Sequence, residues 1–99
     1  MRTASYEEIV LTNSVKTLTA AKVSHPTYGQ AQEVLISGEG GNFRITYDGT
    51  DPAIVAETGH LVMQHEKHGI DKADVLAAAK MINSVTGTPV TLHITYWYF

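Results

Sequence analysis

Apolar and polar residues alternate along much of this 99-residue chain, as expected for β-strands with one buried face. The strictest alternation is the run from Val90 to Phe99, where Val90, Leu92, Ile94, Tyr96 and Tyr98 share one face. Shorter β-rich runs predict strands at residues 8–11, 15–18, 33–37, 43–47 and 61–63. The pattern therefore predicts a mainly β fold, a small antiparallel β-sandwich or barrel-like domain with one short α-helix.

Glycine-rich and polar stretches separate these runs. The sequence GEGGN at residues 38–42 supplies residues that tolerate positive φ, so we expect a β-hairpin between 33–37 and 43–47. The stretch QHEKHG at residues 64–69 is polar and is predicted to be a solvated loop. No repeat or linker is visible, and the length suits one domain spanning residues 1–99.

The segment DKADVLAAAKMIN departs from the period of two. Val75, Leu76, Ala79 and Ile82 follow helical spacing, and Asp71 can cap the first turn. This pattern predicts a helix at about residues 72–80. Residues 81–85 also suit a strand, so the pattern leaves helix and strand open over residues 72–85.

Composition limits the classes of function. Hydrophobic residues make up 43% of the chain, and a net charge of −3 with seven lysines and arginines leaves no basic field for nucleic acid. No apolar run approaches the roughly 20 residues that cross a bilayer, and the first fourteen residues lack the apolar core of a secretory signal. Cysteine is absent, which excludes disulfides and thiolate chemistry. We expect a soluble chain that binds neither nucleic acid nor membrane.

The sequence ITYDGTDPA at residues 45–53 joins a strand-like run to a group of turn-forming residues. Asp48, Asp51 and Glu57 carry carboxylates, but their spacing does not match a calcium-binding loop. A turn explains the same residues, because an aspartate binds the backbone two residues on, glycine tolerates a left-handed conformation and proline fixes φ. We therefore predict a structural turn and re-entry into the next strand, formed by Asp48, Gly49, Thr50, Pro52, Gly59 and His60.

Other candidate chemistry is weak. His60, His65 and His68 lie within nine residues, but strand periodicity sends the first two to opposite faces and no familiar zinc spacing is present. No nucleophile motif or phosphate-binding loop occurs. We therefore predict no catalytic residue, no metal site and no cofactor, and we expect a protein that is not an enzyme.

The chain ends in four aromatic residues, which place large rings on both faces of the last strand: Tyr96, Trp97, Tyr98 and Phe99. Exposed aromatic clusters commonly mark interfaces, so these four are the candidate interface residues. Cover by the helix or by the N-terminal segment is the alternative. A glycan-binding face built from Trp97, Tyr98 and Tyr28 also fits the composition.

The order of motifs resembles small β-sandwich-like structural proteins of tailed-phage virions, in which an arginine-containing strand runs into D-G-T-x-P and then Gly-His. The resemblance covers roughly residues 34–99, about two thirds of the chain. The matching residues are Arg44, Asp48, Gly49, Thr50, Pro52, Gly59, His60 and Tyr96. The resemblance implies a virion component that binds neighbouring proteins. It leaves open the head surface, the head-to-tail junction and the tail.

From these observations we expect a non-enzymatic virion protein. Its predicted role is a capsid decoration or cement subunit that acts as a homo-oligomer through contacts with capsid or other virion proteins. A head-to-tail or tail-associated component and a glycan-binding module are the alternatives.

Overall fold

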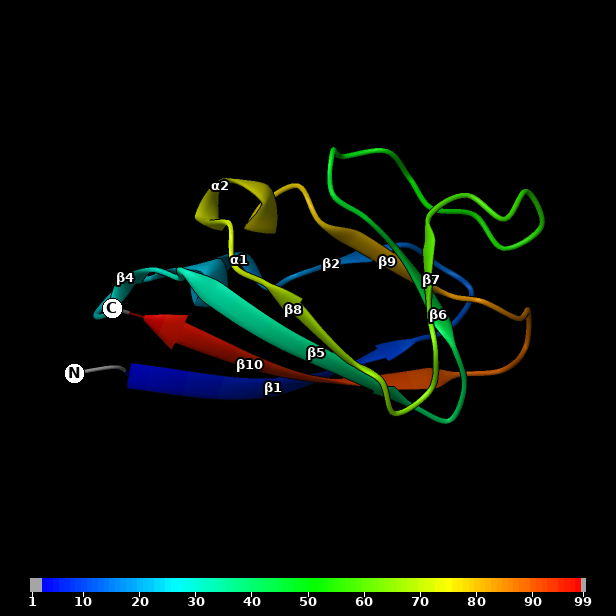
Figure 1. Cartoon of the computed structure of the whole chain (residues 1–99), viewed down its shortest axis with the longest axis horizontal. Helices are drawn as coiled ribbons and strands as arrows, with labels where there is room; N and C mark the ends of the chain where they lie inside the picture. Colours follow the sequence, from blue (N-terminus) through cyan, green and yellow to red (C-terminus); the bar gives the residue numbers. More distant parts are fainter. Residues whose placement is uncertain (1–2, 99) are drawn as a thin grey trace.

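The computed structural model describes residues 3–98 as two antiparallel four-stranded sheets (Figure 1). Sheet A has the order β1 (Thr3–Leu11), β10 (Val90–Tyr98), β5 (Glu33–Glu39) and β8 (Lys67–Ile70). Sheet B has the order β2 (Lys16–Thr17), β9 (Lys80–Asn83), β6 (Phe43–Thr46) and β7 (His60–Val62). The prediction of a mainly β, sandwich-like fold is confirmed.

Three short pieces complete the fold. Helix α1 (Ala20–Val23) leads into a two-stranded ribbon of β3 (Ser24–His25) and β4 (Gly29–Gln30). Helix α2 (Ala73–Leu76) joins β8 to β9 and therefore connects the two sheets. Residues 3–98 therefore contain two one-turn helices, whereas the sequence predicts one short helix at about residues 72–80.

Strand β10 lies between β1 and β5, as its strict alternation of apolar and polar residues suggests. Its inner residues are all buried, from Val90 through Leu92, Ile94 and Tyr96 to Tyr98, while the residues between them are half-buried. Two strand neighbours satisfy its backbone and one core covers one face, so this element follows directly from its pattern.

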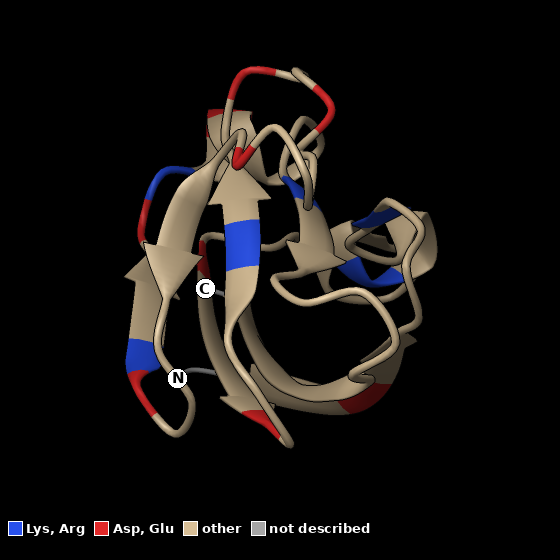
Figure 2. Ribbon diagram, turned by 90° about the vertical axis from the view of Figure 1, so that its right-hand side faces the viewer, with Lys and Arg blue, Asp and Glu red and all other residues tan. Residues whose placement is uncertain are grey.

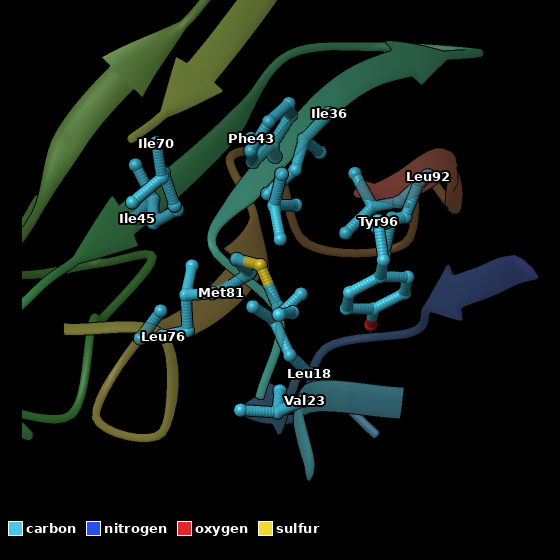
Figure 3. Close-up of a cluster of buried hydrophobic side chains, with 14 of the residues drawn as sticks. Leu18, Val23, Ile36, Phe43, Ile45, Ile70, Leu76, Met81, Leu92 and Tyr96 are labelled. Atoms are coloured by element: carbon cyan, nitrogen blue, oxygen red, sulfur yellow. The ribbon is translucent and has the colours of Figure 1, made fainter. Parts of the chain in front are cut away.

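The core fills the space between the two sheets (Figure 3). Ile36 and Leu92 from sheet A meet Phe43 and Met81 from sheet B, and Leu76 of α2 packs beside Met81. A side chain at Gly38 would collide with Phe43, because an added Cβ would lie 2.9 Å from its ring. Glycine at this position therefore allows the ring to pack closely over β5.

The predicted hairpin between residues 33–37 and 43–47 is wrong. β5 pairs with β10 and β8, whereas β6 pairs with β9 and β7, so residues 40–42 carry the chain from one sheet to the other. Both edges of β5 are already occupied. A glycine-rich connection allows either geometry, and burial of Phe43 between the sheets favours the crossing.

Two further expectations need correction. The helix predicted at about residues 72–80 ends after Leu76, and residues 80–83 form β9, because Met81 faces the core and pairs opposite Ile45. The loop predicted at residues 64–69 contains the start of β8, which pairs with β5 from Lys67 onward. Pairing with an existing strand overrides the polar composition of this segment.

A buried asparagine closes one end of the sandwich. Asn83 is fully buried, and its amide nitrogen donates to the carbonyls of Val85 (2.8 Å) and Thr88 (3.1 Å) and to Oδ1 of Asn13 (3.0 Å). The backbone amide of Asn13 donates to Asn83 Oδ1 at 2.7 Å. These bonds satisfy the buried amide and connect the turn after β1 to the loop before β10.

Candidate functional site

The predicted turn at residues 48–52 has the expected local geometry. The backbone amide of Thr50 donates to Asp48 Oδ1 at 3.0 Å, and Gly49 has a φ of +87°. The hydrogen bonds from Thr50 lower the pKa of the Asp48 carboxyl. Gly59 has a φ of +110° and precedes β7, which begins at His60. The residues predicted to form a turn and re-entry lie as that prediction requires.

The turn belongs to a longer segment, residues 48–59, that lies over the outer face of sheet B. Arg44 Nη1 donates to the carbonyl of Gly59 at 3.1 Å, and Lys80 Nζ lies 2.8 Å from Asp51 Oδ1. Pro52 is buried, and Ile82, which faces outward from β9, is only 5% exposed. Residues 48–59 therefore form a cover, which we call the covering segment.

The three clustered histidines divide between two places. His60 and His68 both lie against Tyr47, with ring centroids 5.5 Å and 5.8 Å from its ring, and His68 Nε2 is hydrogen-bonded to the Tyr47 hydroxyl. His65 lies apart in an exposed turn beside Gln64. Burial lowers the pKa of His68 and raises that of Tyr47, so both groups favour their neutral forms.

Tyr47 follows β6, and its ring lies against His60 of β7 and His68 of β8. A hollow of about 530 Å³ beside it is lined by Thr46, Tyr47, Asp48, Thr50, Gly59 and His60. Within residues 3–98, no three histidine, aspartate or glutamate side chains lie close enough together to hold a metal ion. Tyr47 is hydrogen-bonded to His68, and Asp48 accepts a hydrogen bond from Thr50. We therefore assign Tyr47, Asp48 and His68 a structural role.

The aromatic C-terminus does not form one surface. Tyr96 and Tyr98 are buried inside the chain, so the prediction that they are interface residues is wrong. The hydroxyl of Tyr96 donates to Glu7 Oε2 and that of Tyr98 to the carbonyl of Lys22, both at 2.5 Å. Burial and the Glu7 carboxylate raise the pKa of Tyr96 well above its usual range. Both tyrosines therefore support the fold.

Trp97 lies on the opposite face of β10 and is half-buried, while Phe99 falls outside the described residues. The exposed Tyr28 stacks on His25 with a centroid distance of 4.3 Å and also contacts Tyr98. Tyr28 and Tyr98 therefore adjoin the inner face of β10, and Trp97 lies on its outer face. The three residues proposed for a glycan platform do not share one surface.

The outer face of sheet A is open and carries a connected group of polar and aromatic side chains that sequence reasoning missed. The Tyr6 hydroxyl lies 2.5 Å from Nδ1 of His93 and 3.3 Å from Glu8 Oε2, and His93 Nε2 lies 2.9 Å from Glu39 Oε1. The rings of Tyr6 and His93 are stacked with centroids 6.1 Å apart. We call Tyr6, Glu8, His93 and Glu39 the sheet A cluster.

The cluster spans three strands because their register brings it together. Glu8 of β1 is opposite His93 of β10, and Glu39 of β5 is opposite Thr91, two positions before His93 on the same face. The residue numbers within the cluster differ by up to 87, so only the strand pairing reveals the contacts. The alternation of residues along β1 and β10 indicates which side chains share a face, but the register that brings them together is not visible in the sequence.

The remaining charges do not form a strong field. Figure 2 shows basic and acidic residues scattered over several elements, with no basic strip in that view. None of the helices within residues 3–98 has the length and apolar character needed to cross a membrane.

Comparisons of the chain with protein-family models, with curated proteins and with solved structures gave no match.

Proposed function

We propose that this protein is a non-enzymatic structural component of a tailed-phage virion that acts by binding neighbouring proteins. The proposed role is a capsid decoration or cement subunit, present as a homo-oligomer on the virion. The resemblance of roughly residues 34–99 to virion structural proteins supports this role, and the geometry of the turn at Asp48 is compatible with it.

One observation carries the proposal, the open outer face of sheet A. A sheet whose inner face forms the core is exposed on the other side unless something covers it, and here Tyr6 and Val10 remain about half exposed. Exposed aromatic and apolar side chains beside polar ones are the usual composition of a protein interface. Contacts of this kind, repeated by the symmetry of a capsid, hold a small subunit firmly without a strong individual site.

The test is binding to particles. Purified protein is mixed with virions or capsids that lack it, and the particles are sedimented at micromolar protein concentration. We expect saturable binding at a fixed number of copies per particle, and light scattering that shows an oligomer. A monomer that does not bind the head, the tail or isolated capsid protein would contradict the proposal, and binding to tails alone would favour the tail-associated alternative.

A glycan-binding module is the other candidate that sequence reasoning left open. The exposed ring of Tyr28, stacked on His25, is the one feature that favours it, because stacked rings bind sugars. Titration with sugars, followed by the fluorescence of Trp97 and by chemical shifts of Tyr28, tests this candidate. A saturable change at Tyr28 would favour a glycan module over virion attachment.

A further inference from the structure

The two carboxylates of the sheet A cluster are exposed, and their partners within residues 3–98 are a tyrosine hydroxyl and a histidine. Glu8 contacts the Tyr6 hydroxyl and Glu39 contacts His93, but no lysine or arginine within residues 3–98 forms a salt bridge with either one. The side chain of Glu39 is 63% exposed, and Tyr6, whose hydroxyl contacts Glu8 and His93, is 51% exposed. Carboxylates that remain exposed beside an aromatic ring are a recognised arrangement for binding a cation.

Apolar surface surrounds the cluster. Val10 lies next to Glu8 on the same face of β1, and Leu35 of β5 lies opposite Thr95, which itself lies opposite Tyr6. Gly69, opposite Leu35 on β8, leaves open space, since a Cβ added there would meet nothing within 4 Å. The face therefore offers acidic groups at the cluster and apolar contact on both sides of it.

Tyr6, His93 and Glu39 are linked by hydrogen bonds in the order of a nucleophile, a base and an acid, but this cluster does not fit catalysis. Desolvation and the nearby Glu8 carboxylate raise the pKa of the Tyr6 phenol, so it remains protonated and is a poor nucleophile at neutral pH. The cluster is a binding group in an open sheet surface.

We propose that the outer face of sheet A binds a basic segment of a partner protein, in which arginine or lysine side chains alternate with apolar ones. A guanidinium of the partner stacks on the Tyr6 ring, where Glu8 and Glu39 neutralise its charge, and the apolar side chains contact Val10 and Leu35. This inference rests on the proposed function only for placing the partner in a virion.

Charge argues against two other occupants. A second copy docked face to face would bring Glu8 and Glu39 against the same residues of its neighbour. Among the outer-face residues of sheet A that the structure describes, Lys67 is the only lysine or arginine. An anionic membrane or nucleic acid would be repelled by the same carboxylates. A homo-oligomer of this protein therefore forms through other surfaces.

Trp97 gives a direct readout of this face. It is the only tryptophan, it faces outward from β10, and its opposite residue on β1 is Ala4, two positions from Tyr6. Diagonal neighbours on one sheet face lie within reach of a bound side chain. A ligand seated beside Tyr6 should therefore change the fluorescence of Trp97.

The probe is an acetylated seven-residue peptide of alternating arginine and leucine, titrated into the intact protein while Trp97 fluorescence is recorded. We expect a saturable change that weakens with added salt, and no change with the matching peptide of glutamate and leucine. The double variant Glu8→Gln/Glu39→Gln should bind about tenfold more weakly, and Tyr6→Ala severalfold more weakly. Thermal unfolding followed by circular dichroism confirms that each variant is folded.

The matched control removes two negative charges elsewhere. Glu57→Gln/Asp74→Asn alters the covering segment and α2, so its affinity for the arginine peptide should stay within about twofold of the wild type. Equal losses in both double variants would overturn the proposal, because binding would then follow net charge alone. Concentration-dependent dimerisation abolished by Tyr6→Ala would also overturn it in favour of a second copy.

Particle binding separates this inference from the proposed function. If wild-type protein binds particles and Glu8→Gln/Glu39→Gln binds them equally well, the inference fails and the virion role stands. If wild-type protein ignores particles but selects the arginine peptide through the cluster, the virion role fails and the binding face stands.

Discussion

The two sheets of this sandwich differ in what lies on their outer faces. The outer face of sheet B is covered by residues 48–59, which bury Pro52 and leave Ile82 only 5% exposed. Within residues 3–98, no comparable segment covers the outer face of sheet A, and Tyr6 remains 51% exposed. One outer face of the sandwich is therefore covered and the other is open, and we expect a partner to bind the open face.

The cover of sheet B depends on short polar contacts made by a few residues. Thr46 Oγ1 donates to the carbonyl of Thr50 at 2.5 Å, and Arg44 reaches the carbonyl of Gly59. The motif that begins at Asp48 therefore directs the chain back over its own sheet. Its conspicuous chemistry serves the fold, whereas the site that we propose for a partner lies among the less conspicuous outer residues of sheet A.

The largest expected loss of stability comes from shortening a side chain that lies beneath the covering segment. Ile82→Ala should lower the free energy of unfolding by about 2–4 kcal/mol, because the lost side chain leaves a cavity that the segment above can only partly fill. Val10→Ala, at an open position of sheet A, should cost less than about 1 kcal/mol. Chemical denaturation measures both, and equal losses would show that the two faces are equally covered.

Alanine substitutions at two glycines, one in the covering segment and one on sheet A, test the same difference between the two faces. Gly59→Ala should destabilise the protein by about 1–3 kcal/mol, since Gly59 has a positive φ and an added Cβ would lie 3.2 Å from Arg44 Cβ and 3.3 Å from Pro52 Cβ. Gly69→Ala on sheet A meets open space and should change stability by less than about 1 kcal/mol. The contrast would be refuted if the Gly69→Ala variant were less stable than the Gly59→Ala variant.

The sequence predicts a strand of this fold reliably only where the inner residues of that strand are all apolar. β10 is predictable because its inner residues are all apolar. β1 begins at Thr3 although only residues 8–11 are predicted, since Ser5 and Glu7 lie on its half-buried side and bind Tyr98 and Tyr96. Polar inner residues with specific partners erase the alternation on which the prediction depends.

The covering segment and the sheet A cluster illustrate the same limit for sites. The turn at Asp48 is predictable because all of its contacts are local, two residues apart. The contacts from Tyr6 to His93 and from His93 to Glu39 join residues 87 and 54 positions apart, and they depend on the register of strands that no local motif fixes. Local chemistry is visible in a sequence, and contacts that follow from pairing become visible only in the fold.

The stability of the fold around His68 should depend on pH. Burial depresses the pKa of His68, so the folded state favours its neutral form. The stability from this effect is complete above the unfolded pKa of about 6.5 and is lost as pH falls through the lower folded pKa. The melting temperature should therefore fall between pH 7 and pH 5, and the fall should be smaller in His68→Gln. His65→Gln, in an exposed turn, serves as the control and should keep the wild-type slope.

The smallest expected effect lies at the exposed start of the cover. Asp48→Ala should lower the melting temperature slightly at neutral pH, because Thr50 loses the carboxylate that accepts its amide hydrogen. Those hydrogen bonds depress the pKa of Asp48, so their stabilisation is present above the unfolded value of about 3.8 and is lost as pH falls below it. The difference between wild type and variant should therefore shrink near pH 3. Asp51→Ala, which removes only an exposed salt bridge to Lys80, should change the melting temperature even less. If Asp48→Ala instead abolished partner binding at an unchanged melting temperature, the covered face would be the binding face, and the contrast between the two sheets would have to be reversed.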